Sequence, residues 1–225
     1  MEKINYKYYN RHYKVYVPTI NNSAVVKAVK SNRIWEQKIQ DIIVEYTDND
    51  KSSVCVDIGA YIGVHTILMS SRSEKVICFE PQKLVGECLL KTIQENNLDN
   101  VIFHNCGLWN KKGLMPFVTN NDGDASIAQF RKRKFRENYL VEVHKLDDFN
   151  LDRCDIIKLD AEGSEFEVLA GAMKTIEKFH PIIIIEVWKT MTRIHLLEEF
   201  ACECGYDVRS INAENFLLTP IGYDC

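Results

Sequence analysis

The sequence predicts an α/β fold in which helices cover both faces of a mostly parallel sheet of seven strands that ends in an antiparallel hairpin. Short runs that are apolar throughout, such as VCVDI (54–58) and PIIIIEVW (181–188), are typical of strands buried on both faces. Helical stretches alternate with these runs, which indicates parallel strands joined by crossover helices. Two last strand-like runs, YDVRSI (206–211) and NFLLTP (215–220), flank the turn residues Asn212 to Glu214 and predict the hairpin.

The first 50 residues are expected to form an extension that packs on the sheet or its rim. Apolar residues at helical spacing from Trp35 to Tyr46 predict a helix over 31–46, with Ser31 or Asn32 placed to cap its start. A series of tyrosines predicts an edge strand with mixed faces, or alternatively a lid over a pocket. These are Tyr6, Tyr8, Tyr9, Tyr13 and Tyr16.

Residues 51–225 are expected to form the core of a single domain that spans 1–225. After the strand at 54–58, a glycine loop leads into a helix that ends near Ser71. Strands at 75–80 and 100–105 flank a helix over 82–96. Four apolar residues of this helix are spaced to face inward, namely Leu84, Cys88, Leu89 and Ile93. Residues 106–153 follow a looser pattern and contain one strand-like run, YLVEVHKL (139–146).

The second half of the core returns to clear alternation. A buried strand is predicted over 154–160, and Ser164 with Glu167 has the spacing of a capping box that opens a helix through about Lys178. The most apolar strand, 181–188, is followed by a helix over 192–203.

The composition is that of an ordinary globular domain. Of the 225 residues, 46% are hydrophobic and 27% are charged. A formal net charge of −4 creates no global positive field for nucleic acid. No apolar run reaches the roughly 20 residues that cross a bilayer. The N-terminal residues lack the apolar core of a secretory signal.

The cysteines are predicted to be reduced. There are eight, without a C-x-x-C pair. Cys55, Cys78 and Cys154 sit in or beside apolar strand-like runs, where a thiol packs as a small hydrophobe. Free structural thiols indicate a cytoplasmic location.

Polar residues that end the predicted parallel strands point to one site. In chain order these residues are Asp57, Glu80, Asn105, Asp160 and Glu186. Because parallel strands bring their carboxyl ends to the same edge of a sheet, and ligands bind there, we expect these side chains to cluster around a ligand.

The loop VDIGAYIGVHT (56–66) follows the first of these strands. Dinucleotide loops have the pattern G-x-G-x-x-G, which lets the backbone approach a pyrophosphate. Here Gly59 and Gly63 are separated by three residues that include bulky Tyr61, so a pyrophosphate fits poorly. The loop therefore predicts a nucleotide-like ligand without phosphates.

Two carboxylates further restrict the chemical identity of the predicted ligand. Asp57, beside the loop, favours a cationic or zwitterionic ligand. Glu80, at the end of the next strand, is placed to accept both hydroxyls of a ribose. A ligand with a ribose and an amino-acid portion but no phosphate is S-adenosylmethionine (SAM), which is the predicted cofactor.

Six segments have the order and spacing of a known family. They are VDIGAYIGVHT, CFEP, NVIFHNCGLWN, KLDDFN, IIKLDAEGSEFEVLAGA and PIIIIEVW. Over roughly residues 52–190 they resemble the FkbM family of SAM-dependent methyltransferases, and KLDAEGSEFEVLAGA is the most specific of them. The resemblance implies a Rossmann-like class I methyltransferase fold. It also implies methylation of a hydroxyl on a sugar, a glycan or another small acceptor.

The resemblance assigns roles to matching positions. The glycine loop matches the cofactor loop, with Tyr61 where the family often has His or Asn. Glu80 matches the ribose-binding acid, and residues 105–107 fall near the expected adenine edge. Ser126 matches a small polar position. The full set of candidate cofactor-binding residues is Asp57, Gly59, Ala60, Tyr61, Gly63, Thr66, Glu80, Pro81, Asn105, Cys106, Gly107, Ser126 and Asp160.

Asp160, Glu162 and Glu186 are the candidate catalytic residues. Methyl transfer is an in-line displacement that depends on positioning the nucleophile, and a hydroxyl nucleophile gains from a nearby base. Glu162 is either such a base or a cap of the following helix. Glu186 is costly to bury alone, so it contacts the substrate or pairs with a residue such as Lys158. No histidine has suitable spacing to join Asp160 and Glu186, so no metal site is predicted.

Other functions stay open. The basic run RKRKFRE (131–137) is interpreted as solvated loop charge, or alternatively as a clamp for an acidic substrate. A clamp would favour an RNA or nucleotide methyltransferase. A cofactor-binding scaffold without turnover is a further alternative. A nicotinamide-dependent oxidoreductase is disfavoured by the missing central glycine.

Overall fold

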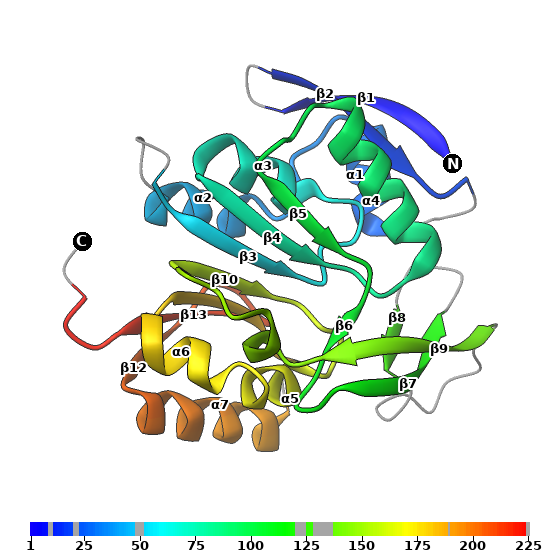
Figure 1. Cartoon of the computed structure of the whole chain (residues 1–225). Coiled ribbons are helices and arrows are strands. Elements are labelled where there is room, and N and C mark those ends of the chain that lie inside the picture. The colour runs from blue at the N-terminus through cyan, green and yellow to red at the C-terminus, as the bar shows by residue number, and fades with distance from the viewer. Residues whose placement is uncertain are drawn as a thin grey trace.

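A seven-stranded sheet lies at the centre of the computed structural model, which describes residues 1–8, 11–19, 23–47, 52–119, 125–127, 137–188 and 190–223 (Figure 1). Its strands are β3 (Val54–Ile58), β4 (Lys75–Phe79), β5 (Val101–His104), β10 (Ile156–Leu159), β11 (Ile182–Glu186), β12 (Tyr206–Ser210) and β13 (Asn215–Pro220). Their order is β12-β13-β11-β10-β3-β4-β5. Strands β11 to β5 are parallel, and the β12–β13 hairpin adds an antiparallel edge. The predicted fold class is confirmed.

Helices cover both faces of this sheet (Figure 1). One face carries α1 (Ala24–Lys30), α2 (Gln37–Tyr46), α3 (Val64–Arg72) and α4 (Lys83–Glu95). The other face carries α5 (Glu165–Ala170), α6 (Met173–Phe179) and α7 (Met191–Cys204). An apolar core fills the space on each side. Within the described residues, no helix is both long enough and apolar enough to span a membrane.

The alternation of side chains along β3 decides which face its polar residue reaches. Val56 and Ile58 belong to the core beneath α5–α7, and Cys55 belongs to the core beneath α1–α3. Because successive side chains of a strand point to opposite faces, Asp57 shares the face of Cys55. Asp57 therefore points toward α3.

The same alternation brings charged residues from two neighbouring strands to this face. Lys158 of β10 is in register with Asp57. Asp160 lies two residues beyond Lys158, so it stands on the same side. In β11, Ile184 is in register with Lys158, and Glu186 lies two residues beyond Ile184. Glu186 therefore stands on the same side as well. The sheet thus gathers these four side chains beneath α1–α3.

A second, four-stranded sheet lies beside the carboxyl ends of the central strands (Figure 1). It consists of β6 (Gly107–Leu108), β7 (Gly113–Thr119), β8 (Ala125–Ile127) and β9 (Glu137–His144), in the order β6-β9-β7-β8, and a 3-10 helix, η2 (Leu146–Phe149), follows it. The sequence predicted only the strand now seen as β9. Trp109, Phe117 and Val141 belong to the small apolar core of this sheet.

The tyrosine-rich N-terminus forms two strands with mixed faces, as predicted, but in the described part of the chain they make a separate hairpin and do not join the main sheet. Among the described strands, β1 (Glu2–Tyr8) and β2 (Arg11–Val17) pair only with each other. The hairpin packs on α4, where the Tyr16 N–H donates to Thr92 Oγ1 over 3.0 Å. Tyr6, Tyr8 and Tyr13 are buried, and Tyr9 lies outside the described residues.

The predicted helix over 31–46 is wrong in its first part. Residues 24–30 form the separate helix α1, which Ser31 ends, and α2 begins only at Gln37. Between the two helices, Asn32 and Glu36 have left-handed φ values of +53° and +48°. A continuous right-handed helix cannot contain these residues.

The predicted capping box of Ser164 and Glu167 is also wrong. Ser164 occupies the N-cap position of α5, but its side chain makes no capping hydrogen bond. The carboxylate of Glu165 instead accepts the Gly163 N–H, at 2.8 Å. The helix predicted through about Lys178 is broken in two at Gly171.

In α4 the inward face differs from the prediction by one residue. Cys88, Leu89 and Ile93 are buried as expected, but Leu84 is 49% exposed. Val85 is buried in its place, three and four residues before Cys88 and Leu89 and thus on the same stripe of the helix.

Gly171→Ala is expected to destabilise the protein. A Cβ at Gly171 would lie 2.0 Å from the Trp109 carbonyl oxygen. Trp109 belongs to the core of the second sheet and Gly171 to the break between α5 and α6, so the second sheet packs closely on this break. Relieving such a clash costs about 1–3 kcal/mol or more in the free energy of unfolding. Urea denaturation measures this loss. Gly113→Ala is the matched control, because a Cβ added there would meet no described atom within 4 Å. Equal stability of the two variants would contradict the close contact.

Candidate functional site

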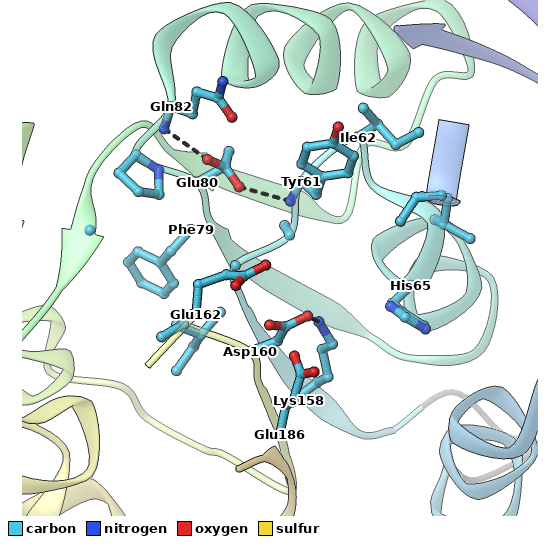
Figure 2. Close-up of a pocket in the computed structure, with 18 of the residues that line it drawn as sticks. Tyr61, Ile62, His65, Phe79, Glu80, Gln82, Lys158, Asp160, Glu162 and Glu186 are labelled. Atoms are coloured by element: carbon cyan, nitrogen blue, oxygen red, sulfur yellow. Dashed lines mark hydrogen bonds and ion pairs between the residues drawn. The ribbon is translucent and has the colours of Figure 1, made fainter. Parts of the chain in front are cut away.

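A cavity of about 470 Å³ opens at the carboxyl ends of β3, β4, β10 and β11. This volume lies within the roughly 300–1,000 Å³ that is usual for small-molecule sites. Figure 2 shows Glu80 and Gln82 at one end of the cavity, with Lys158, Asp160 and Glu186 grouped away from them. The sequence-predicted residues that line it are Gly59, Ala60, Tyr61, Glu80, Pro81, Cys106, Gly107, Asp160, Glu162 and Glu186.

The glycines after β3 are required by packing. Gly59 has φ +76°, and a Cβ there would lie 1.8 Å from the Asp160 carbonyl oxygen. Gly63 has φ +86°, and its Cβ would lie 2.5 Å from Leu89 Cδ1 of α4. Gly63 itself does not line the cavity. These positions hold the loop against β10 and α4, and they leave the backbone of Tyr61 facing the cavity.

Asp57 and Thr66 stand behind the cavity wall, although the sequence places them in the cofactor set. Asp57 is fully buried, and Thr66 Oγ1 donates to its Oδ2 over 2.6 Å. Burial raises the pKa of Asp57, while Lys158 and the Thr66 hydroxyl counteract this rise. The pair ties the start of α3 to the end of β3.

Glu80 lines the cavity with a fixed carboxylate. Its Oε2 accepts the Tyr61 N–H at 2.9 Å, and its Oε1 accepts the Gln82 N–H at 2.8 Å (Figure 2). Burial raises the pKa of Glu80 to about 7, against the lowering effect of these two hydrogen bonds. Both oxygens keep a lone pair for a ligand.

The residues after β5 divide into two groups. Cys106 and Gly107 line the cavity. Asn105 is exposed, and its Nδ2 donates to the Glu80 carbonyl oxygen at 2.6 Å, so it supports the loop from outside. Ser126 has its backbone in β8, paired with Val118, and its side chain lies outside the described part of the chain, as does the basic run 131–136.

Lys158, Asp160 and Glu186 form a charged group in which Lys158 is buried and the two carboxyl groups are partly buried. Lys158 Nζ lies 3.1 Å from Asp160 Oδ2, so the ion pair of Lys158 is with Asp160. Of the two alternatives for Glu186, the one that paired it with Lys158 is therefore not what the structure shows. Burial alone would raise the pKa of Asp160, but Lys158 and a hydrogen bond with Glu186 outweigh burial and hold it below its ordinary value. Burial and the Asp160 charge raise the pKa of Glu186. The arrangement keeps one proton, on Glu186, between the two carboxyl groups.

Two residues that the sequence did not single out hold the loop after β10. The Glu165 carboxylate accepts the N–H groups of Ala161 and Gly163, and it forms an ion pair with Arg193 of α7. Arg193 Nη1 also donates to the Gly163 carbonyl oxygen at 3.1 Å. Glu162 projects from this loop with φ +52° and lines the cavity. The motif EGSE contained Glu165, but nothing local in the sequence pointed to Arg193.

The N-terminal segment contributes a wall that the sequence did not predict. Ser23, Lys27, Trp35 and Glu36 line the cavity, whereas none of the described tyrosines before Val17 does. Glu36 Oε2 lies 3.5 Å from Nε2 of His65 in α3. Burial lowers the pKa of His65 to about 3, helped by the charge of Lys158, so the imidazole is neutral and the contact is not an ion pair.

Within the described ranges, no group of three or more His, Cys, Asp or Glu side chains is placed to hold a metal ion.

Comparison with known proteins agrees with this architecture. Residues 57–208 match the model of the methyltransferase FkbM domain. The chain is 22% identical to methyltransferase sdnD of Sordaria araneosa, over 84% of this chain and 87% of the relative. It is 26% identical to the 2-O-methyltransferase NoeI of Sinorhizobium fredii, over 56% of this chain and 59% of that protein.

A solved structure shares the fold. The crystal structure of an FkbM methyltransferase from Methylobacillus flagellatus superposes with a TM-score of 0.57 at 21% identity. The match covers 75% of this chain and 43% of that one, so this chain spans less than half of the solved chain.

Thr66→Val is expected to lower stability. The change keeps the side-chain shape and removes the hydroxyl that donates to buried Asp57. Leaving a buried acceptor without its donor costs about 1–3 kcal/mol in the free energy of unfolding. Urea denaturation checks this value. Thr219→Val, at a half-buried position of β13, is the control and should change stability by less than about 0.5 kcal/mol. A Thr66 variant as stable as the control would contradict the role given to this bond.

Proposed function

Because the chain belongs to the FkbM methyltransferase family, we propose that its cavity binds SAM and that the enzyme methylates a hydroxyl oxygen of a sugar, a glycan or another small acceptor. The observation that supports the cofactor most directly is the Glu80 carboxylate, which two backbone N–H groups fix at the cavity wall.

The residues around Glu80 fit a nucleoside. Each Glu80 oxygen accepts one backbone N–H and has a further lone pair for a ribose hydroxyl. Phe79, Pro81 and Leu108 give the neighbouring wall an apolar character suited to an adenine ring. Gly59, Ala60 and Tyr61 line the cavity, and Gly59 packs against the Asp160 backbone, so this loop would hold the methionine portion.

The charged group at the other end fits the acceptor. SAM, when bound, supplies an electrophilic methyl group whose transfer to the acceptor oxygen leaves S-adenosylhomocysteine (SAH). Lys158 keeps Asp160 ionised, so this carboxylate orients the acceptor hydroxyl and takes its proton as that oxygen gains the methyl group. Glu186, whose pKa is raised, keeps its own carboxyl proton and donates it in a hydrogen bond to Asp160.

Transfer to oxygen is supported by the relative NoeI, a 2-O-methyltransferase. The scaffold alternative receives less support, because Asp160, Glu162 and Glu186 all border the cavity, as an active enzyme requires. An RNA acceptor is the second candidate: a relative from Fusobacterium nucleatum, named an uncharacterized RNA methyltransferase, is 28% identical over 58% of this chain and 27% of that protein.

Titration calorimetry with SAH and with NADH tests the cofactor. SAH is expected to bind, because it has the ribose and the amino-acid portion that the cavity fits. NADH is expected not to bind, because Tyr61 stands where a pyrophosphate would need an open backbone. Binding of NADH without binding of SAH would overturn the proposal.

Glu80→Ala is expected to weaken SAH binding by about 1–3 kcal/mol, or about 5- to 150-fold in Kd. The reason is that two ribose hydroxyls lose their acceptor. Calorimetry on the purified variant measures this change. Glu87→Ala, at an exposed position of α4, is the control and should bind SAH as the unmodified protein does. Unchanged affinity of the Glu80 variant would show that the ribose does not lie at Glu80.

A further inference from the structure

We propose that Glu36 and His65 bind a hydroxyl group of the methyl acceptor and thereby direct the enzyme to hydroxylated acceptors without anionic groups. This inference rests on the proposed methyl transfer and names the residues that select its substrate.

His65 lines the cavity, and its Nε2 is a buried polar atom without a hydrogen-bond partner among the described residues. Its side chain is 7% exposed. The nearest polar atom described is Glu36 Oε2, at 3.5 Å. Buried polar groups are nearly always paired in folded proteins, so an unpaired one at a cavity wall indicates a ligand atom.

The backbone at Glu36 directs its carboxylate toward this position. Glu36 has φ +48° and precedes α2 without capping it. Lys158 and Asp160 both influence the pKa of Glu36, which burial raises, so the Glu36 carboxyl group lies close to the charged group of β10. Two sides of the acceptor end are thus formed by Glu36 with His65 and by Asp160 with Glu186.

A hydroxyl is the group that satisfies both residues. It donates one hydrogen bond and accepts others. When Nε2 of neutral His65 carries the proton, a hydroxyl accepts from it while donating to the Glu36 carboxylate. A fully ionised phosphate has no hydrogen to donate to Glu36. The pair therefore favours an alcohol over a phosphate.

Charge excludes anionic acceptors from the same space. Glu36, Asp160 and Glu162 present carboxyl groups there. Of the two described lining cations, Lys158 is paired with Asp160 and Lys27 is exposed to solvent. A phosphate or carboxylate placed there would lose water and meet like charges.

Glu36 also lies outside the segment that defines the family. The family match begins at residue 57, so Glu36 belongs to a part of the chain that members sharing only this segment need not possess. His65 lies within the match and supplies the opposite side. Acceptor choice therefore depends on an N-terminal residue added to a common core.

The test measures transfer from methyl-tritiated SAM to two sets of probes by the full chain. One set holds neutral methyl glycosides, such as methyl α-D-glucopyranoside, methyl α-D-mannopyranoside and methyl α-L-fucopyranoside. The other holds glucose 1-phosphate, mannose 6-phosphate and a short RNA. We expect methylation within the neutral set and none in the anionic set.

Two variants connect this selectivity to the residues. His65→Leu fills the imidazole volume without polar atoms, and Glu36→Asn keeps a residue that tolerates left-handed φ while withdrawing the carboxylate. Each should lower kcat/KM for the methylated glycoside by about 5- to 150-fold. Each should leave the Kd of SAH within about twofold. Glu45→Asn, at an exposed position of α2, is the control.

The outcomes separate this inference from the proposed function. Failure of SAH to bind overturns both. Normal SAH binding with methylation confined to the anionic probes, or with no methylation of any neutral glycoside, overturns the inference alone. Variants that retain the kcat/KM of the unmodified protein for the glycoside also overturn it.

Discussion

The close approach of Gly59 to the Asp160 carbonyl oxygen is the contact on which the cavity depends. A single added methyl carbon would lie 1.8 Å from that oxygen, so no other residue fits there without moving one of the two loops. Because β3 and β10 are adjacent and parallel, their loops leave the sheet side by side. The contact brings the predicted cofactor loop and the Asp160 carboxylate to one wall. On the proposed function, backbone packing thus sets how far the methyl donor would lie from the acceptor.

The charges at this wall are tolerated because Asp160 interacts with both Lys158 and Glu186. Asp160 meets the ammonium of Lys158 on one side and the proton of Glu186 on the other. Removing Lys158 or Asp160 alone would leave the other without its partner of opposite charge, which is among the costlier changes in a folded protein. The alternation of the strands makes the grouping possible, because positions 158, 160 and 186 all face α1–α3.

Local and periodic structure could be predicted from the sequence. Apolar runs located the central strands, and strand ends located Glu80 and Asp160, because parallel strands must share an edge. Features that depend on residues distant in sequence could not be predicted. Arg193 and Glu36 reach the site through contacts that no periodicity encodes. The left-handed residues Asn32 and Glu36 interrupt a segment whose apolar spacing favours one helix. In the second sheet, β6 and β8 are only two and three residues long, and β7 contains Pro116, which weakens its strand pattern.

The raised pKa of Glu80 links cofactor exchange to proton exchange. Burial raises the pKa of Glu80 to about 7, so protonation of this carboxyl group competes with its ionised form near neutral pH. On the proposed function, the ribose hydroxyls donate to the ionised carboxylate, so binding favours the form that has lost its proton. Averaged over many molecules, cofactor binding therefore releases a fraction of a proton per site to the buffer. The heat of binding then varies with the ionisation enthalpy of the buffer, and mild acidification promotes release of the spent cofactor.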